Sequence, residues 1–130
     1  MTTIPKLTEL ELTLMQIIWA HAREISVGEI KTALEHEQHP LALPSIRTML
    51  GILQDKGFIE RRLSGKAYLY KALIPATTYQ RSFISTLLER AFNGSASSLV
   101  SALLSKEDVD KEEIDKIKQL ISAFEARNKS

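Results

Sequence analysis

The chain contains no cysteine, so disulfides, thiol catalysis and cysteine-based metal sites are all excluded. It also has no uninterrupted apolar run approaching about 18 residues, the length at which a membrane-spanning helix is expected. Residues 1–6 lack the long apolar segment of a signal peptide. From these absences we expect a cytoplasmic protein without a membrane span.

The 130 residues are 44% hydrophobic and 25% charged, which is ordinary for a globular protein of one domain, or of a small domain with an oligomerisation arm. The net charge of +1 is unevenly distributed. Residues 44–72 hold six basic and two acidic side chains, a balance of +4, which leaves −3 for the rest of the chain. A basic stretch in a nearly neutral chain predicts a confined surface for an anionic partner.

Two capping boxes predict the first two helices. Thr8 and Glu11 have the spacing at which each side chain satisfies the other's backbone N–H, and Ser26 and Glu29 repeat it. We expect the first helix to end near Ala22 and a short extended link to precede the second. The apolar residues at helical spacing after each box form two predicted buried stripes, namely Leu10, Leu14, Ile17 and Ile18, then Val27, Ile30 and Leu34.

A third helix is predicted to begin at Pro44, because a missing N–H costs nothing in the first turn, and to end at Gly57. Residues 58–63 and 67–72 have the composition of strands, and residues 64–66 form the turn of a hairpin between them. Three short helices followed by a hairpin are typical of a winged helix-turn-helix. The residues of the third helix predicted to face inward are Ile46, Met49, Leu50 and Leu53.

Beyond Pro75 the pattern predicts three more amphipathic helices, the first ending at residues 93–94 and the last capped by residues 105–108. So short a segment cannot bury all this apolar surface alone, whereas pairing with an identical chain would cover it. The predicted fold is mainly α with a small β-hairpin: a winged helix-turn-helix DNA-binding domain over residues 1–74 and a helical dimerisation domain over residues 75–130. The residues predicted to form the dimer contact are Phe83, Leu87, Leu99, Leu103, Ile114, Ile117, Ile121 and Phe124.

The outward face of the third helix is the predicted DNA-reading surface. Arg47 offers a forked donor for guanine or a phosphate, and the hydroxyls of Ser45 and Thr48 suit either. Gly51 lets the backbone come close to a duplex, and Ile52 on the rim is placed to touch a thymine methyl. Residues near the start of a recognition helix are the ones that reach base edges. A polar outward face is also what any solvated surface helix presents, so this pattern alone does not decide the function.

Arg61, Arg62 and Lys66 cluster on and around the predicted hairpin turn, where phosphates or a minor groove could be met. Positive charge also protects an edge strand from aggregation, and the two interpretations are compatible. Added to the third helix, this basic hairpin favours a DNA-binding protein.

Six segments of the chain have a familiar order and spacing, namely Leu7–Glu11, Ile17–Trp19, Glu29–Ile30, Ser45–Leu50, Lys56–Ile59 and Ser98–Val100. With them the chain resembles the penicillinase-repressor (BlaI/MecI/CopY) family over nearly its whole length. The resemblance implies a homodimeric winged-helix repressor of β-lactam resistance genes that binds a palindromic operator and dimerises through its helical C-terminal arm. It also implies that Ser45, Arg47 and Thr48 belong to the recognition helix, and the three basic residues of the hairpin to the wing.

Two positions depart from the family's pattern. Ile52 stands where members commonly have a basic residue, which implies a different operator sequence. Several members are released from DNA when a membrane-embedded sensor metalloprotease, activated by a β-lactam, cleaves them, and the cleavage point corresponds here to Ala102 and Leu103. The copper-responsive branch of the family uses a C-terminal cysteine cluster, which this chain lacks.

An enzyme is not predicted. His36 and His39 have the spacing of metal ligands, but zinc needs three or four converging ligands, so a polar loop is the favoured interpretation. No arrangement for nucleophilic catalysis and no glycine-rich phosphate loop is evident, and the sequence predicts neither a metal nor a cofactor. Two other functions stay open: a winged-helix regulator gated by a small molecule, and a winged helix that contacts only proteins.

Overall fold

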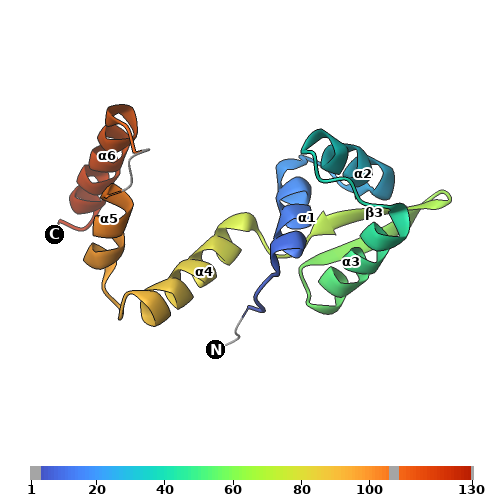
Figure 1. The fold of residues 1–130 in the computed structure, drawn as a ribbon, viewed down its shortest axis with the longest axis horizontal. Helices are drawn as coiled ribbons and strands as arrows, with labels where there is room; N and C mark the ends of the chain where they lie inside the picture. The colour runs from blue at the N-terminus through green and yellow to red at the C-terminus, as the bar shows by residue number, and fades with distance from the viewer. Residues whose placement is uncertain (1–3, 106–108, 130) are drawn as a thin grey trace. The chain divides into compact units, whose positions relative to one another are not determined.

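The computed structural model describes residues 4–105 and 109–129, and the chain divides into two compact units, Met1–Ile84 and Ser85–Ser130. In the first unit three helices pack against one another and the β-hairpin extends beyond them (Figure 1). The elements of this unit that precede Pro75 are α1 (Glu9–Ala20), β1 (Ile25–Ser26), α2 (Val27–His36), α3 (Leu43–Asp55), β2 (Ile59–Ser64) and β3 (Ala67–Ala72). The prediction of a mainly helical fold with a hairpin after the third helix is confirmed.

The strands form one antiparallel sheet in the order β1-β3-β2. The hairpin closes at Ser64 and Ala67, and Gly65 between them has φ +65°, a left-handed value that a glycine adopts without strain. The predicted extended link before the second helix is part of this sheet, since Ile25 pairs with Tyr70. The sheet is therefore wider than the predicted hairpin by one short strand.

Both predicted capping boxes are present. Thr8 accepts a hydrogen bond from the Glu11 N–H at 3.2 Å and its own N–H donates to Glu11 Oε1 at 2.9 Å, and Ser26 and Glu29 form the same pair of bonds at 3.1 and 2.9 Å. Several boundaries differ from the prediction by one or two residues. The first helix ends at Ala20 rather than near Ala22, and α3 begins one residue before Pro44, which still lies in the first turn. The first strand of the hairpin runs over Ile59–Ser64 rather than over residues 58–63.

The core of the first unit lies between the helices and the sheet, and the predicted inward residues make up much of it. Gly57 directly follows the C-cap of α3 and has the left-handed φ of +82° that is typical of a helix end. The chain then returns to the core at Phe58, which is fully buried. Each such side chain stabilises the fold by roughly 1.5–3 kcal/mol through burial. Fully buried apolar residues are Leu14, Met15, Ile30, Leu34, Ile46, Leu50, Leu53 and Phe58.

The first unit extends into α4 (Ala76–Ala91) through one aromatic side chain. Tyr79 is only 6% exposed and its ring lies 5.7 Å from that of Phe58 and 5.9 Å from that of Trp19. Its hydroxyl accepts a hydrogen bond from the Leu7 N–H at 3.2 Å, and the Trp19 indole N–H donates to the Ile74 carbonyl at 2.9 Å. The start of α4 is thus packed into the core of the winged-helix unit.

The second unit contains the end of α4, then α5 (Ala96–Leu104) and α6 (Lys111–Arg127). The cap predicted at residues 105–108 is wrong for the part that can be compared: Ser105 ends α5, and Asp110 caps α6 by accepting the Glu113 N–H at 2.9 Å. The remainder of that predicted cap, residues 106–108, lies outside the described residues. No residue of α5 or α6 is buried in the single chain. Within residues 4–105 and 109–129, no helix has the length and apolarity to cross a membrane.

One ion pair crosses the core of the first unit. Glu11, which is 4% exposed, accepts a hydrogen bond from Lys56 Nζ at 2.6 Å, and the same ammonium donates to the Lys6 carbonyl at 3.2 Å. Burial raises the pKa of Glu11, but the bonds from Lys56 and from the Thr8 backbone, with the charge of Lys56, outweigh burial and hold the pKa below its ordinary value of 4.5. This pair connects the N-terminus of α1 to the end of α3.

Replacing Lys56 by Met is expected to lower the free energy of unfolding at pH 7 by about 2 kcal/mol, because a buried carboxylate loses its charged partner. Since the folded pKa of Glu11 is depressed, the pair stabilises the fold above pH 4.5, and this contribution is lost as the pH falls through the folded pKa. Urea unfolding of both proteins at pH 7 and pH 4 measures the effect. Lys71→Met is the control, because it removes an exposed pair worth less than about 1 kcal/mol. Equal losses for the two variants would contradict the prediction.

Candidate nucleic-acid interface

The outward face of α3 carries the predicted DNA-reading residues. Ser45, Arg47 and Thr48 are exposed, Gly51 is half-buried and Ile52 is 37% exposed at the rim. The Thr48 hydroxyl donates to the Pro44 carbonyl at 3.0 Å, so its free lone pairs leave it an acceptor toward any partner. The helix therefore presents one forked cation beside small residues that leave its backbone accessible.

The two wing arginines lie on opposite faces of the sheet. The register places Arg61 opposite Tyr70 and Arg62 opposite Leu69 on β3. Consecutive side chains of a strand point to opposite faces, and Tyr70 is buried against the helices. Arg61 therefore shares the helix-facing side of the sheet, whereas Arg62 projects from the other side.

Arg61 is held by an aromatic ring. Its guanidinium carbon lies 3.9 Å from the centroid of Tyr68, within the range of a cation–π contact. Tyr68 is exposed and comes from the facing strand of the hairpin. This contact limits the freedom of Arg61 without neutralising its charge.

A groove of about 630 Å³ runs between α3 and the wing and is lined by four of the predicted DNA-binding residues. Arg47 and Gly51 come from the helix, and Arg61 and Lys66 come from the hairpin, whereas Ser45, Thr48, Ile52 and Arg62 do not line the groove. The groove also contains residues that the sequence did not single out for DNA binding, namely Ser26, Val27, Gly28, Leu43, Gln54, Ala67, Tyr68 and Tyr70. The structure thus brings a helix face and a hairpin together into one concave surface.

Ion pairs divide the six basic residues of the 44–72 stretch into two sets. Three of them have carboxylate partners: Lys56 with Glu11 at 2.6 Å, Arg62 with Glu24 at 2.8 Å, and Lys71 with Glu60 at 3.4 Å. The other three, Arg47, Arg61 and Lys66, form no ion pair with any carboxylate of the described residues. All three line the groove, so the uncompensated charge of this stretch is concentrated there.

Two of the additional groove residues had signals in the sequence. Gln54 lies seven residues after Arg47 and three after Gly51, which is one face of a helix. Tyr68 alternates with Tyr70 on β3, so it shares a face with Arg61. The residues at the start of α2 had none, because only the tertiary packing brings that helix beside the wing.

His36 and His39, the pair considered as metal ligands, are both exposed. Across the described ranges, no three His, Cys, Asp or Glu side chains are grouped so as to hold a metal ion.

Three helices, a three-stranded sheet and a projecting hairpin define the first unit as a winged helix. The unit resembles the solution structure of the DNA-binding domain of the repressor BlaI, with a TM-score of 0.51 and 29% identity over 61% of this chain and 94% of that one. A second structure, of monomeric Bacillus licheniformis BlaI in complex with the blaP half-operator, matches with a TM-score of 0.50, the same identity and the same coverage.

The sequence profile described as penicillinase repressor matches residues 7–123, so the chain belongs to the penicillinase repressor family. The chain is 28% identical to the penicillinase repressor of Bacillus licheniformis over 99% of both sequences. It is 26% identical to the methicillin resistance regulatory protein MecI of Staphylococcus aureus over 90% of this chain and 94% of that protein. Membership confirms the family resemblance and the prediction that the chain is not an enzyme.

Gly51→Ala tests whether a partner comes close to the helix backbone. Apart from the adjacent backbone of α3 and the two neighbouring residues, no atom lies within 4 Å of the position that an added Cβ would take. The fold therefore accepts alanine, which should raise the free energy of unfolding by roughly 0.5–1 kcal/mol. The same methyl would project into the groove and is expected to weaken DNA binding. Thermal unfolding and fluorescence anisotropy with duplex DNA measure the two effects. A gain in stability with unchanged DNA affinity would show that no duplex approaches this position.

Proposed function

We propose that the chain acts in the cytoplasm as a homodimeric transcriptional repressor that binds a palindromic operator through the groove between α3 and the wing. The observation that carries the proposal is that Arg47, Arg61 and Lys66 line one concave surface. None of these three basic side chains has a carboxylate partner among the described residues. A relative that is 29% identical over this unit is bound to a half-operator in its solution structure.

The residues of α3 and of the wing take different roles in this proposal. Arg47, with the exposed Ser45, Thr48 and Ile52 on the same helix, faces the base edges, because it lies in the first turns of the recognition helix. Arg61 and Lys66 contact phosphates, since they project from the hairpin rather than from the helix. Arg62, predicted from the sequence to join them, contributes only when its pair with Glu24 opens.

The test uses a palindromic duplex recovered by selection with this protein from a random library, and a random-sequence duplex of equal length. Arg47→Ala is expected to lose about 1–3 kcal/mol of affinity for the selected duplex and little for the random one. Arg61→Ala should weaken both alike and reduce the slope of log K against log salt by about 0.9. Fluorescence anisotropy over a salt series measures both effects.

Arg23→Ala is the control for that series, because Arg23 is an exposed arginine that lines a different hollow. If the selection recovers no duplex and the wild type binds all DNA alike, the repressor proposal fails and a winged helix that contacts proteins replaces it. A selected duplex whose binding is unaffected by Arg47→Ala would refute the proposed groove.

The dimer part of the proposal is supported by the apolar side chains of the second unit. Phe124 is 58% exposed and Ile121 is 52% exposed on α6, and Leu103 is exposed on α5. Exposed side chains at helical spacing form a continuous apolar stripe, which a second copy of the chain would remove from water. The residues proposed to form this contact, all exposed or half-buried in the single chain, are Phe83, Leu87, Leu99, Leu103, Ile114, Ile117, Ile121 and Phe124.

Replacing Ile121 and Phe124 together by Glu is expected to convert the dimer to a monomer, because two charges would then have to be buried in the contact. Sedimentation velocity measures the mass of the particle. The control is Gln119→Glu, whose position lies on the opposite side of the same helix and is exposed. A double variant that sediments as the wild-type dimer would place the contact elsewhere.

We further propose that a membrane sensor metalloprotease ends repression by cutting at Ala102 and Leu103. Both residues are exposed, and they lie near the end of α5. Unwinding this turn in a single chain gives up little packing, because α5 has no buried residue.

A further inference from the structure

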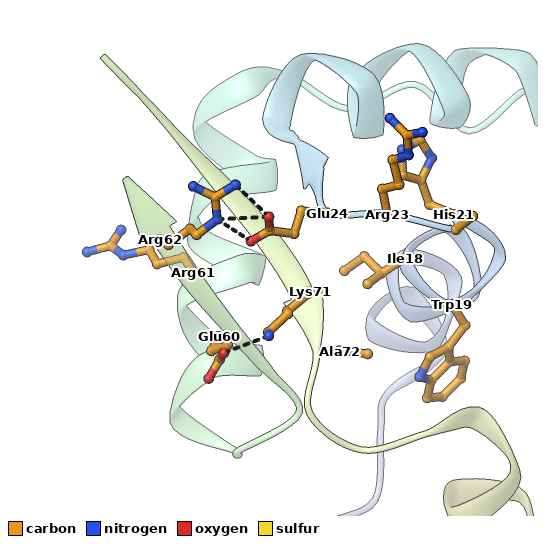
Figure 2. A pocket seen from close by; sticks show the side chains of 11 residues that line it. Ile18, Trp19, His21, Arg23, Glu24, Glu60, Arg61, Arg62, Lys71 and Ala72 are labelled. Carbon is orange, nitrogen blue, oxygen red and sulfur yellow. Dashed lines mark hydrogen bonds and ion pairs between the residues drawn. The ribbon is translucent and has the colours of Figure 1, made fainter. Parts of the chain in front are cut away.

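Glu24 and Arg62 form the most extensive ion pair on the wing. Arg62 Nε lies 2.8 Å from each carboxylate oxygen of Glu24, and Arg62 Nη2 lies 2.8 Å from Oε1. Figure 2 shows the two side chains pointing toward one another, while Arg61, the next residue along β2, points away. The hydrogen bond from Arg62 and its charge lower the pKa of Glu24, and Glu24 in turn raises the pKa of Arg62.

The pair spans the whole width of the sheet. Glu24 directly precedes β1, Arg62 lies on β2, and β3 runs between these two strands. Arg62 therefore reaches across β3 on the face of the sheet that is turned away from the helix core. Lys71 and Glu60 form a second ion pair on this face, at 3.4 Å (Figure 2). Both basic side chains of β2 and β3 on this face, Arg62 and Lys71, therefore have a carboxylate partner.

We propose that Glu24 withholds Arg62 from DNA phosphates and thereby limits the sequence-independent affinity of the protein for DNA. The proposal rests on the proposed function, because it requires that the wing lie against a duplex. A carboxylate and a phosphate both present paired oxygens to the guanidinium fork, so Glu24 occupies the donors that a phosphate would use.

The position of Arg62 makes this competition effective. Arg62 is two residues from the end of β2, which is roughly 7 Å along the strand, and Lys66 lies in the turn beyond. The Arg62 side chain is 59% exposed even in the ion pair. Once released from Glu24, it would reach the DNA phosphates near those that Lys66 is proposed to contact. Phosphate contacts carry no sequence information and supply nearly all of non-specific binding. Releasing Arg62 should thus strengthen binding to the operator and to random DNA by the same factor.

The experiment measures binding of the full-length protein to a random-sequence duplex across a salt series. Glu24→Gln keeps the shape of the side chain but removes its charge, and should raise affinity for random DNA roughly three- to tenfold near 0.1 M salt and steepen the salt slope by about 0.9. The affinity for the selected duplex should rise by the same factor, because a phosphate contact does not depend on sequence. Arg62→Gln alone should leave random-DNA affinity near that of the wild type, because the arginine is already occupied.

Two controls separate the release of Arg62 from a general change in charge. Glu37→Gln gives the same change in net charge at the end of α2, where the carboxylate has no ion-pair partner among the described residues. The double variant Glu24→Gln with Arg62→Gln should return to wild-type affinity. Equal thermal unfolding of all variants shows that the wing is intact.

Four results would overturn the inference. The first three are unchanged affinity in Glu24→Gln, an equal rise in Glu37→Gln, and a rise that persists in the double variant. The fourth is a fall in affinity in both single variants, since the pair would then be a support for the wing. None of these results bears on the proposed function, which Arg47→Ala tests on the selected duplex. If the wild type selects no duplex, the proposed function fails whatever Glu24→Gln does to random DNA.

Discussion

Consecutive side chains of β2 point to opposite faces of the sheet, and this constraint determines what each basic residue of the wing can do. Arg61 and Arg62 are neighbours in the sequence, yet one stacks on Tyr68 on the helix-facing side of the sheet and the other binds Glu24 on the far face. A shift of the register by one residue would exchange the two arginines. Ile59 at the start of β2 resists such a shift, because its side chain is buried in the core and a shift would turn it outward.

The role of each basic residue in the first unit is consequently determined by its partner in the fold and not by its position in the sequence. Lys56 lies between the basic residues of α3 and those of the hairpin, but it stabilises the core through Glu11. Lys71 and Arg62 are neutralised across the sheet. A net charge of +1 for the whole chain is thus compatible with a strongly cationic groove, because the compensating carboxylates lie elsewhere.

The sequence predicted local features well and distant ones poorly, and the reason is physical. Both capping boxes join residues three apart, so their hydrogen bonds depend on the local chain alone. The start of α3 was displaced by one residue because its N-cap, Ala42, has no side chain that could mark it. The cap predicted from Ser105 copied the spacing of a true box, but Asp110 performs that function. The winged-helix fold followed from the order of such local signals.

The candidate site was predicted only in part, because ion pairs between residues far apart in the chain decide which basic side chains remain available for DNA. Glu24 and Arg62 are 38 residues apart, and Glu11 and Lys56 are 45 apart. No periodicity relates such residues, so neither the position of Arg62 beside Arg61 and Lys66 in the sequence nor the family resemblance indicated its pair with Glu24.

The root of the helical arm also depends on distant contacts. Tyr79 packs on Trp19 and Phe58, and its hydroxyl accepts the Leu7 N–H, so a residue of the arm's first helix is part of the core of the DNA-binding unit. In a dimer that binds two half-sites, each contact raises the effective concentration of the other only if the connection between them is defined. Cutting the chain at Pro75 would remove Tyr79 and weaken the winged helix itself. A loss of DNA affinity in such a fragment would therefore combine two causes, whereas charge on Ile121 and Phe124 would alter only the dimer contact that we propose.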